Sequence, residues 1–406
     1  MPFAWFVALR YLRDAKGQTA LILAAVSVGV SVIVFLSALI NGLQASLIDK
    51  TLGSQPHVTV RVPREAPRAL VEPTAETAIA RNVQATSQRL RSIDQWPLVM
   101  ADLERVAGVT AVAPLVTGAG FARRGDAKLP IAVRGIDAER FLSILDVRRS
   151  IVAGRYDVAG GNVLVASTLA TDLGVAPGDK LRMTTSEGVD DTVTVAGVFT
   201  LGNEAVDSTW VLTSLRHAQS LYALPGGATS LELKVADVFD AERVAQTAHD
   251  RSGLDAQSWM KRNAELLAGL SAQSGSKAVI QFFVVVAVAL GIASVLIVSV
   301  VQKSREIGIL RAVGTAPRRV LAVFLIQGGV LGLLGSIVGS AFGALLSKLF
   351  ESMARDPNGA PKFPIELDLS LFAATAALAT GVGLLAAVIP ARRAARLDPA
   401  KAIRNG

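Results

Sequence analysis

Cysteine is absent from this chain of 406 residues, and histidine occurs only three times, as His57, His217 and His249. Without cysteine there can be no disulfide, no thiolate metal ligand and no cysteine nucleophile. The histidines lie far apart and lack the spacing of a metal-ligand motif, so each is expected to be structural and no bound metal is predicted. Any folded domain must therefore be held together by an apolar core, which a chain of this length can supply.

The sequence also lacks a nucleotide-binding loop and a Gly-x-Ser-x-Gly nucleophile motif. The segment most similar to a phosphate loop is GLSAQSGSK, from Gly269 to Lys277. A Walker A loop has four residues between its glycines and then Gly-Lys-Ser/Thr, whereas here five residues intervene and the order is Gly-Ser-Lys. We therefore predict no catalytic residue and no cofactor bound by this chain, and we do not expect it to be an enzyme.

Charge is missing from four long stretches, which are Thr19–Ile40, Ala278–Val301, Val320–Ser347 and Leu369–Ala391. Each could cross a hydrocarbon core of about 30 Å as a helix that rises roughly 1.5 Å per residue. The chain is 51% hydrophobic with a mean hydropathy of +0.46, which is high for a water-soluble protein of this length. We predict four transmembrane helices. The absence of ionisable groups inside them argues against a secondary transporter, because ion pathways usually contain such groups.

Residues 43–277 contain no comparable apolar run, and their charges, glycines and prolines separate short apolar segments. Several of these segments alternate with period two, as in HVTVRV and DTVTVAGVF, which is typical of half-buried strands. Others, such as DAERVAQTAHDRSG, are helical in pattern. This stretch is predicted to be an α+β domain. Within it, residues 64–100 are polar and are expected to form a loosely packed helical or partly mobile excursion.

The basic residues next to the predicted helices orient the chain. The short flanking segments hold only three acidic residues, Asp14, Glu306 and Asp398. The basic residues there are Arg10, Arg13, Lys16, Lys303, Arg305, Arg311, Arg318, Arg319, Arg392, Arg393, Arg396, Lys401 and Arg404. The positive-inside rule therefore places both termini and the loop at 302–319 in the cytoplasm and the large domain outside. The net charge of +8 is explained by this topology and is not taken as a sign of nucleic-acid binding.

The predicted fold is an α-helical membrane protein with four transmembrane helices and a large α+β periplasmic domain inserted between helices 1 and 2. The expected divisions are a cytoplasmic amphipathic helix at 1–18, transmembrane helices at 19–42, 278–301, 320–347 and 369–391, the periplasmic domain at 43–277, a cytoplasmic helix at 302–319, a periplasmic loop at 348–368 and a cytoplasmic tail at 392–406.

The first 18 residues place Phe3, Phe6, Val7 and Tyr11 close to one helical face, with the basic residues elsewhere. This pattern predicts an amphipathic helix on the cytoplasmic membrane surface. The alternative is that these residues are simply the first turns of the first transmembrane helix.

The third apolar stretch carries two sets of glycines, and within each set neighbouring glycines are four residues apart. Small residues at this spacing let helix backbones approach closely in lipid. The partner could be another helix of this chain or a helix of a second membrane subunit, and the spacing favours neither. The glycines are Gly328, Gly332, Gly335, Gly339 and Gly343.

The charged segment KSREIGILRAVGTAPRRV, residues 303–320, lies between two uncharged stretches. Its apolar residues have helical spacing, Gly314 is suited to end the helix, and Thr315 could cap the next one with Pro317 in its first turn. An exposed apolar ridge with basic ends suits insertion into the groove of a cytoplasmic protein. The alternative is a helix that lies on the membrane surface.

This segment and its continuation, SREIGILRAVGTAPRRVLAVFLIQGGVLGLLGSIVG, resemble the signature of the FtsX-like, or MacB-type, ABC permease family. The C-terminal PARRAARLDPAKAIR also resembles that family's signature. Four further segments, ALRYLR, NGLQASLIDKTLGSQPHVTV, VAPLV and VRGID, together with IQGGVLG, are similar to the lipoprotein-releasing LolC/LolE branch.

The resemblance implies that the segment is a coupling helix, bound by a separate cytoplasmic ATPase subunit that holds the ATP and Mg. Ile309, Leu310 and Val313 would fill the ATPase groove, Arg305 and Arg311 would meet an acidic rim, and Glu306 would meet a basic partner. With Gly314, which ends the helix, the set is Arg305, Glu306, Ile309, Leu310, Arg311, Val313 and Gly314.

The resemblance further implies a multi-pass protein of the bacterial inner membrane that transmits ATP-driven motion to its periplasmic domain and releases lipoprotein-like cargo from the membrane. Its expected partners are the ATPase, a second permease subunit (a copy of itself or a paralogue), the cargo, membrane lipid, and a periplasmic chaperone or adaptor, with no nucleic acid. The alternatives are a MacB- or DevC-like efflux permease with an outer-membrane channel, and an FtsX-like regulator of cell-wall hydrolases that moves no cargo.

Overall fold

The computed structural model describes residues 3–63, 90–354, 365 and 367–397. The chain divides into two compact units. One consists of residues 1–47 and 268–406 and is entirely helical where it is described, and the other consists of residues 48–267 and is rich in strands.

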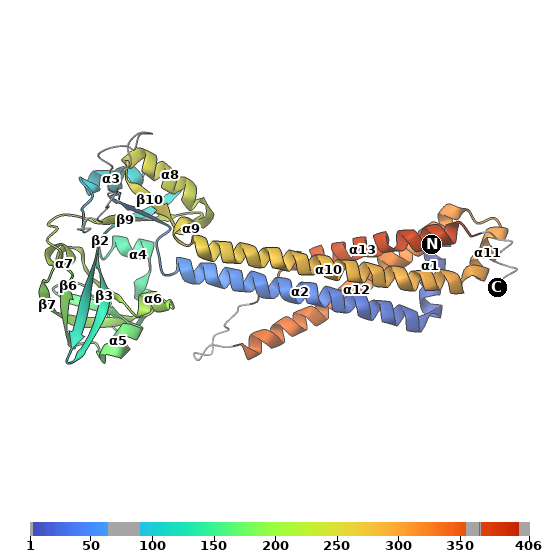
Figure 1. Cartoon of the computed structure of the whole chain (residues 1–406), viewed down its shortest axis with the longest axis horizontal. Helices are drawn as coiled ribbons and strands as arrows, with labels where there is room; N and C mark the ends of the chain where they lie inside the picture. The colour runs from blue at the N-terminus through green and yellow to red at the C-terminus, as the bar shows by residue number, and fades with distance from the viewer. Residues whose placement is uncertain (1–2, 64–89, 355–364, 366, 398–406) are drawn as a thin grey trace, which may run out of the picture. The chain divides into compact units, whose positions relative to one another are not determined.

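The helical unit contains the four apolar helices that the missing charges predicted, and this prediction is confirmed. They are α2 (Lys16–Leu52), α10 (Ala264–Gln302), α12 (Pro317–Met353) and α13 (Leu369–Ala395), and each is long and apolar enough to cross a membrane. Two shorter helices belong to the same unit, α1 (Phe3–Asp14) and α11 (Ser304–Ala312) (Figure 1). Helices suit lipid because every backbone hydrogen bond is made within the segment.

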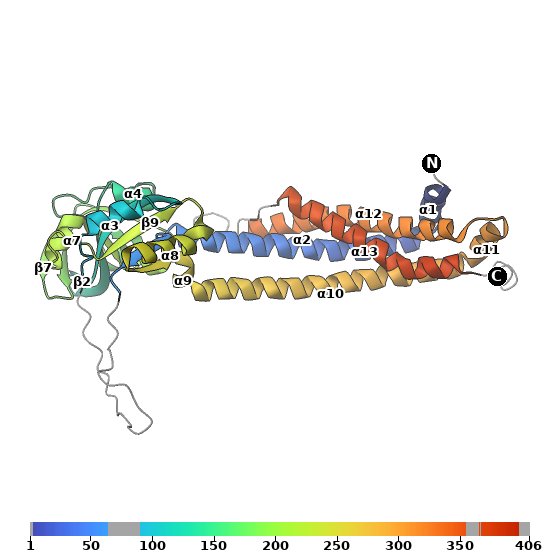
Figure 2. The same cartoon turned by 90° about the horizontal axis from the view of Figure 1, so that it is seen from above.

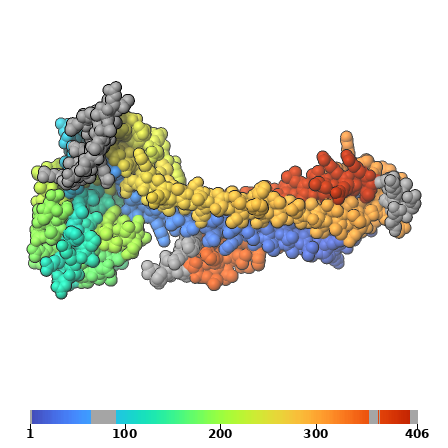
Figure 3. Space-filling view, viewed as in Figure 1, coloured from blue at the N-terminus to red at the C-terminus, as the bar shows by residue number. Residues whose placement is uncertain are grey.

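Helices α2 and α10 lie side by side in opposite directions (Figures 1 and 2). In the space-filling view, the blue surface of α2 and the yellow-to-orange surface of α10 run alongside each other (Figure 3). Polar side chains bond across the seam at four places. The pairs are Gln18 with Gln302, Ser37 with Gln281, Asn41 with Lys277 and Gln44 with Ser274, at 2.7, 2.8, 3.0 and 2.9 Å. The two residue numbers of each pair have nearly the same sum, which is the register of a straight antiparallel pair.

The described residues of the second unit form one ten-stranded sheet, with strand order β10-β1-β9-β2-β3-β8-β5-β7-β4 and with β6 paired to β2 and β7. The strands are β1 (Val58–Arg61), β2 (Val109–Arg124), β3 (Ala127–Ile136), β4 (Ile151–Gly154), β5 (Asn162–Ala166), β6 (Lys180–Thr185), β7 (Asp190–Phe199), β8 (Trp210–Ser214), β9 (Ser230–Val235) and β10 (Asp255–Ser258).

Short helices cover this sheet, and alternate strand residues form its apolar core. The helices are α3 (Trp96–Leu103), α4 (Arg140–Ile144), α5 (Ser167–Leu173), α6 (Glu204–Asp207), α7 (Leu215–Leu221), α8 (Ala241–Ser252) and α9 (Trp259–Arg262). One core cluster gathers around Trp259, which is fully buried against Val58, Leu233 and Val244. The mixture of strands and short helices agrees with the predicted α+β character.

Most of the predicted excursion at 64–100, residues 64–89, lies outside the described residues. Near its end, Trp96 begins the helix α3, whose first turn contains Pro97, in agreement with the helical alternative. Proline is well tolerated there because the first N–H groups of a helix have no intrahelical partner.

Candidate functional site

Helix α11 corresponds to the charged segment singled out in the sequence, and its end has the predicted glycine. Gly314 has φ +99°, and two bonds close the turn around it. The N–H of Gly314 donates to the carbonyl of Arg311 at 3.0 Å, and the N–H of Thr315 donates to that of Leu310 at 3.1 Å. This bond pair is the Schellman motif, in which only a residue such as glycine accepts the left-handed backbone.

The start of the next helix differs from the prediction in one respect. Pro317 is in the first turn of α12, as expected, but the N-cap is Ala316 and no side chain caps it. Thr315 is instead used by the Schellman turn through its backbone N–H. The connection between α11 and α12 is therefore only a few residues long and closely bonded.

The two faces of α11 have different surroundings. Ile307 is 1% exposed and packs with Val300, Phe324 and Ala394, from α10, α12 and α13. On the opposite face, Ile309 is 48% exposed and Val313 is 83% exposed. These two residues lie one helical turn apart and form an apolar ridge.

Leu310 does not belong to this ridge. It is half-buried and lines a small cavity with Phe3, Val7 and Tyr11 of α1 and Phe324 of α12. The predicted groove-filling set of Ile309, Leu310 and Val313 is therefore divided by the structure, with two members at the surface and one turned toward the chain's own helices.

The polar residues at the start of α11 interact with α1. Lys303 Nζ lies 2.8 Å from Glu306 Oε1 and 5.3 Å from the centre of the Tyr11 ring. Burial, and then the neighbouring Glu306 carboxylate, raise the pKa of Tyr11 to about 12. Glu306 therefore has partners within the chain, while Arg305 is exposed on the surface of the helix.

Arg311 reaches a different helix. Its Nη1 donates to the carbonyl oxygens of Ala395 at 2.8 Å and Leu397 at 2.7 Å, where α13 ends. The last carbonyls of a helix have no intrahelical partner, and a cation is favourable at this end. Sequence analysis missed this contact, because the accepting groups are backbone atoms more than 80 residues away along the chain.

The five glycines of α12 that the spacing singled out contact two helices of this chain. A Cβ on Gly328 or Gly332 would lie 2.3 or 2.4 Å from a backbone oxygen of α13. A Cβ on Gly335 would lie 2.5 Å from Val26 of α2, and Gly339 and Gly343 face the same helix. Packing within the chain, one of the two alternatives left open by the spacing, thus occupies these positions.

A buried glutamine joins α12 to α1, which is a helix of its own, separate from the first turns of α2. Gln327 is 2% exposed, and its Nε2 lies 3.4 Å from the carbonyl oxygen of Ala8. Ala8 and Tyr11 are also buried against Val323. Tyr11 thus packs within the chain, whereas Phe3 and Phe6 are exposed.

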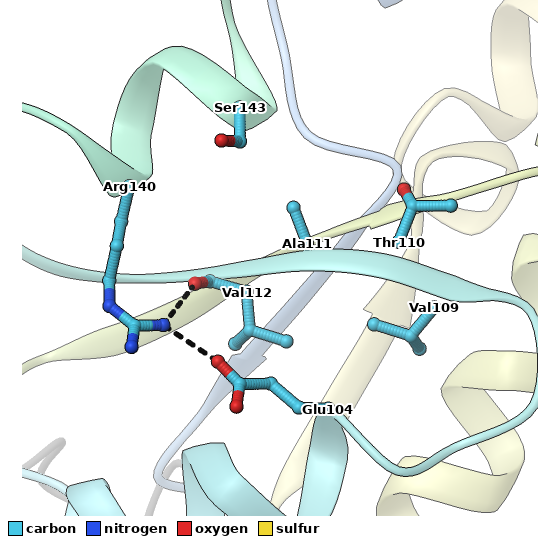
Figure 4. Close-up of a pocket in the computed structure, with 7 residues that line it drawn as sticks. All are labelled: Glu104, Val109, Thr110, Ala111, Val112, Arg140 and Ser143. Carbon is cyan, nitrogen blue, oxygen red and sulfur yellow. Dashed lines mark hydrogen bonds and ion pairs between the residues drawn. The ribbon is translucent and has the colours of Figure 1, made fainter.

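A second candidate site is a cleft in the strand-rich unit, beside the first residues of β2 (Figure 4). Arg140 of α4 donates to Glu104 Oε1 at 2.6 Å and to the carbonyl oxygen of Val112 at 3.5 Å. The other side chains, from Val109, Thr110, Ala111 and Ser143, supply no nucleophile with an adjacent base. Among the described residues there is also no cluster of His, Asp or Glu that could hold a metal ion. The cleft offers no catalytic arrangement.

Comparison with known proteins identifies two family domains in this chain. The model of the MacB-like periplasmic core domain matches residues 19–250, and that of the FtsX-like permease C-terminal domain matches residues 278–399. The lipoprotein-releasing system transmembrane protein LolC of Neisseria meningitidis is 25% identical over 99% of this chain and 98% of its own length.

Two other relatives show how far the similarity extends. The lipoprotein-releasing system transmembrane protein LolE of Haemophilus influenzae is 22% identical over the whole of both chains. The macrolide export ATP-binding/permease protein MacB of Neisseria gonorrhoeae is 30% identical, but over only 28% of this chain and 17% of its own length. The chain therefore belongs to the family with a MacB-like periplasmic core domain and an FtsX-like permease domain, and it is an ABC transporter permease of the LolC/MacB/FtsX type.

Proposed function

We propose that this chain is the permease subunit of a lipoprotein-releasing ABC transporter in a bacterial inner membrane. The similarity to LolC and LolE extends over nearly the whole chain, which supports lipoprotein-like cargo. The basic residues beside the four apolar helices support cytoplasmic termini and a cytoplasmic α11, with the strand-rich unit in the periplasm. A second permease subunit, the same chain or a paralogue, would complete the transporter.

The exposed ridge of Ile309 and Val313 carries the proposal of an ATPase partner. An apolar pair at the surface of a charged helix loses contact with water when it enters a groove, which favours binding. The helix that bears the ridge is held by a Schellman turn, by the packing of Ile307 and by the bonds of Arg311. A force on the ridge would therefore be passed to α10 and α12. ATP and Mg would be bound by the ATPase, and this chain would change no covalent bond.

The test is co-purification from membranes in mild detergent, with the bound proteins identified by mass spectrometry. Val313→Asp places a charge on the ridge without disturbing the core, whereas Leu310→Asp would also disturb the packing against α1. We expect wild type to retain a small ATPase and Val313→Asp to lose it, while the apolar control Val313→Leu keeps it. Retention by all three, or by none, would contradict the proposal.

The proteins that co-purify from the periplasm distinguish the cargo. A lipoprotein chaperone supports lipoprotein release. The local match to MacB favours efflux as the second candidate, and an adaptor with an outer-membrane channel would support it.

A further inference from the structure

Helix α11 is joined directly along the chain to α10 and α12, but not to the fourth apolar helix, α13. Helix α11 follows α10 directly through Lys303 and leads into α12 through the turn at Gly314. Helix α13 begins only at Leu369, beyond the far end of α12. Along the chain, a displacement of α11 would thus reach α13 last, after the whole length of α12.

Contacts through space provide a shorter route. Val300, Ile307, Phe324 and Ala394 bring the ends of α10, α11, α12 and α13 into one apolar cluster. At its edge, Arg311 donates from one nitrogen to two carbonyl oxygens, those of Ala395 and Leu397. Ala395 is the last residue of α13 and Leu397 lies two residues beyond it, so the bonds hold the backbone at the C-terminal end of the helix.

The glycine contacts between α12 and α13 are of a different kind. Gly328 and Gly383 bring the two backbones together by packing alone, and neither residue has a side chain that could donate a hydrogen bond to the other helix. Hydrogen bonds are directional, and two bonds from one guanidinium fix both the distance and the orientation of the acceptors. Arg311 therefore adds a directional restraint between α11 and the end of α13, which glycine packing between α12 and α13 does not supply.

We propose that Arg311 is a positioning residue that joins the C-terminal end of α13 to α11, so that motion of α11 is delivered directly to α13. This inference rests on the proposed function, because it takes the ATPase as the source of that motion. It also assigns Arg311 to a contact within the permease, whereas the family resemblance suggested that Arg311 contacts the ATPase. The ridge of Ile309 and Val313 remains the surface for the partner.

The absence of native cysteine allows a direct test with single-cysteine reporters. Leu369→Cys reports on the far end of α13 and Met353→Cys on the far end of α12, and the native side chains are 82% and 78% exposed. Each reporter chain, with its ATPase in lipid nanodiscs, is labelled with a maleimide, without nucleotide and with ATP plus vanadate. For each reporter, the measured quantity is the labelling rate with ATP plus vanadate divided by the labelling rate without nucleotide.

We expect Arg311→Gln to keep the ATPase and to keep the nucleotide-dependent ratio at Met353→Cys. At Leu369→Cys the ratio should fall to about 1, because α13 no longer follows α11. Arg311→Lys, which retains donors at this place, should restore part of the response. The matched control is Arg396→Gln, which removes an exposed guanidinium located between the two accepting residues, and it should behave as wild type.

Each other outcome has a separate meaning. If Leu369→Cys still responds in Arg311→Gln, α13 follows α11 through other contacts and the inference is wrong. If Arg311→Gln loses the ATPase, or abolishes the response at both reporters, Arg311 serves the partner interface or the general fold, and the inference is again wrong. If the wild-type chain binds no ATPase, the proposed function fails, and the inference fails with it.

Discussion

Gly328 of α12 and Gly383 of α13 meet backbone to backbone. A Cβ on Gly328 would lie 2.3 Å from the carbonyl oxygen of Gly383, and a Cβ on Gly383 would lie 2.2 Å from that of Gly328. No real Cβ approaches a carbonyl oxygen so closely, so neither position can accept a side chain unless the helices separate. The contact explains the spacing of small residues in these helices.

This contact predicts a large difference between two neighbouring glycines of α13. Gly383→Val should force the helices apart and lower the unfolding free energy by about 1–3 kcal/mol, the usual cost of overpacking. Gly381, where a Cβ would meet nothing within 4 Å, is the matched control, and Gly381→Val should change little. Thermal unfolding of the purified full chain in detergent measures both. Equal effects would contradict the close contact.

The antiparallel pair of α2 and α10 predicts an engineered disulfide. A Cβ on Gly29 would lie 3.9 Å from the Cβ of Val288, within the range that disulfides require. Gly29→Cys with Val288→Cys should therefore form a disulfide on mild oxidation. After the chain is cut by a protease between the two sites, a disulfide holds the fragments together, and this is seen as a shift in gel mobility. Gly29→Cys with Leu290→Cys, whose native side chain is exposed, should not crosslink.

Alkaline pH should reveal the burial of all three tyrosines. Burial raises the pKa of Tyr11 and of Tyr156 to about 12 and raises the pKa of Tyr222 above its usual value. Since the unfolded chain loses these protons near pH 10.0 while the folded chain keeps them, stability should fall as the pH rises above that value. Tyrosinate absorbance should be nearly absent from the folded chain at about pH 10.5 and appear on unfolding. If the folded chain formed tyrosinate with a midpoint near pH 10, the burial of the tyrosines would be contradicted.

His57 predicts a loss of stability on the acidic side. It is buried, its Nδ1 lies 3.1 Å from the backbone nitrogen of Val235, and burial lowers its pKa from the usual 6.5. As the pH falls below 6.5, the unfolded chain binds a proton that the folded chain does not, so stability decreases. The melting temperature should drop between about pH 7.5 and 5.5, and less so in His57→Gln. The exposed His249→Gln is the control, and its drop should equal that of wild type.

Features that depend on long uniform patterns were predictable from the sequence. The missing charges identified all four apolar helices, and period-two alternation identified β7 because one face of that strand is buried. The strand β2 was missed, although it is the longest described. Its interior contains Pro114, Gly118 and Gly120, which ordinarily argue against a strand. Glycine is required at position 118 because the ring of Tyr222 would lie 2.2 Å from a Cβ there.

The details of the candidate site depended on tertiary packing. Helical spacing places Ile309 and Val313 on one face of α11 and Ile307 and Leu310 on another, but both faces are apolar. Only the neighbouring helices decide which one is buried, and they bury Ile307. The contact of Arg311 also could not be predicted from the sequence, because any residue type can supply a backbone carbonyl oxygen.

Under the proposed function, the paired helices α2 and α10 would also act as a lever. Their cross-seam bonds run from Gln18 to Gln44, which is about 40 Å of helix at roughly 1.5 Å per residue. A tilt of about 5° at one end of such a pair moves the other end by roughly 3 Å, without breaking any bond within it. Because each helix is held by the other, the pair resists bending more than a single helix would. A small rotation beside α11 would therefore arrive at the far end of the pair as a displacement comparable to the width of a water molecule.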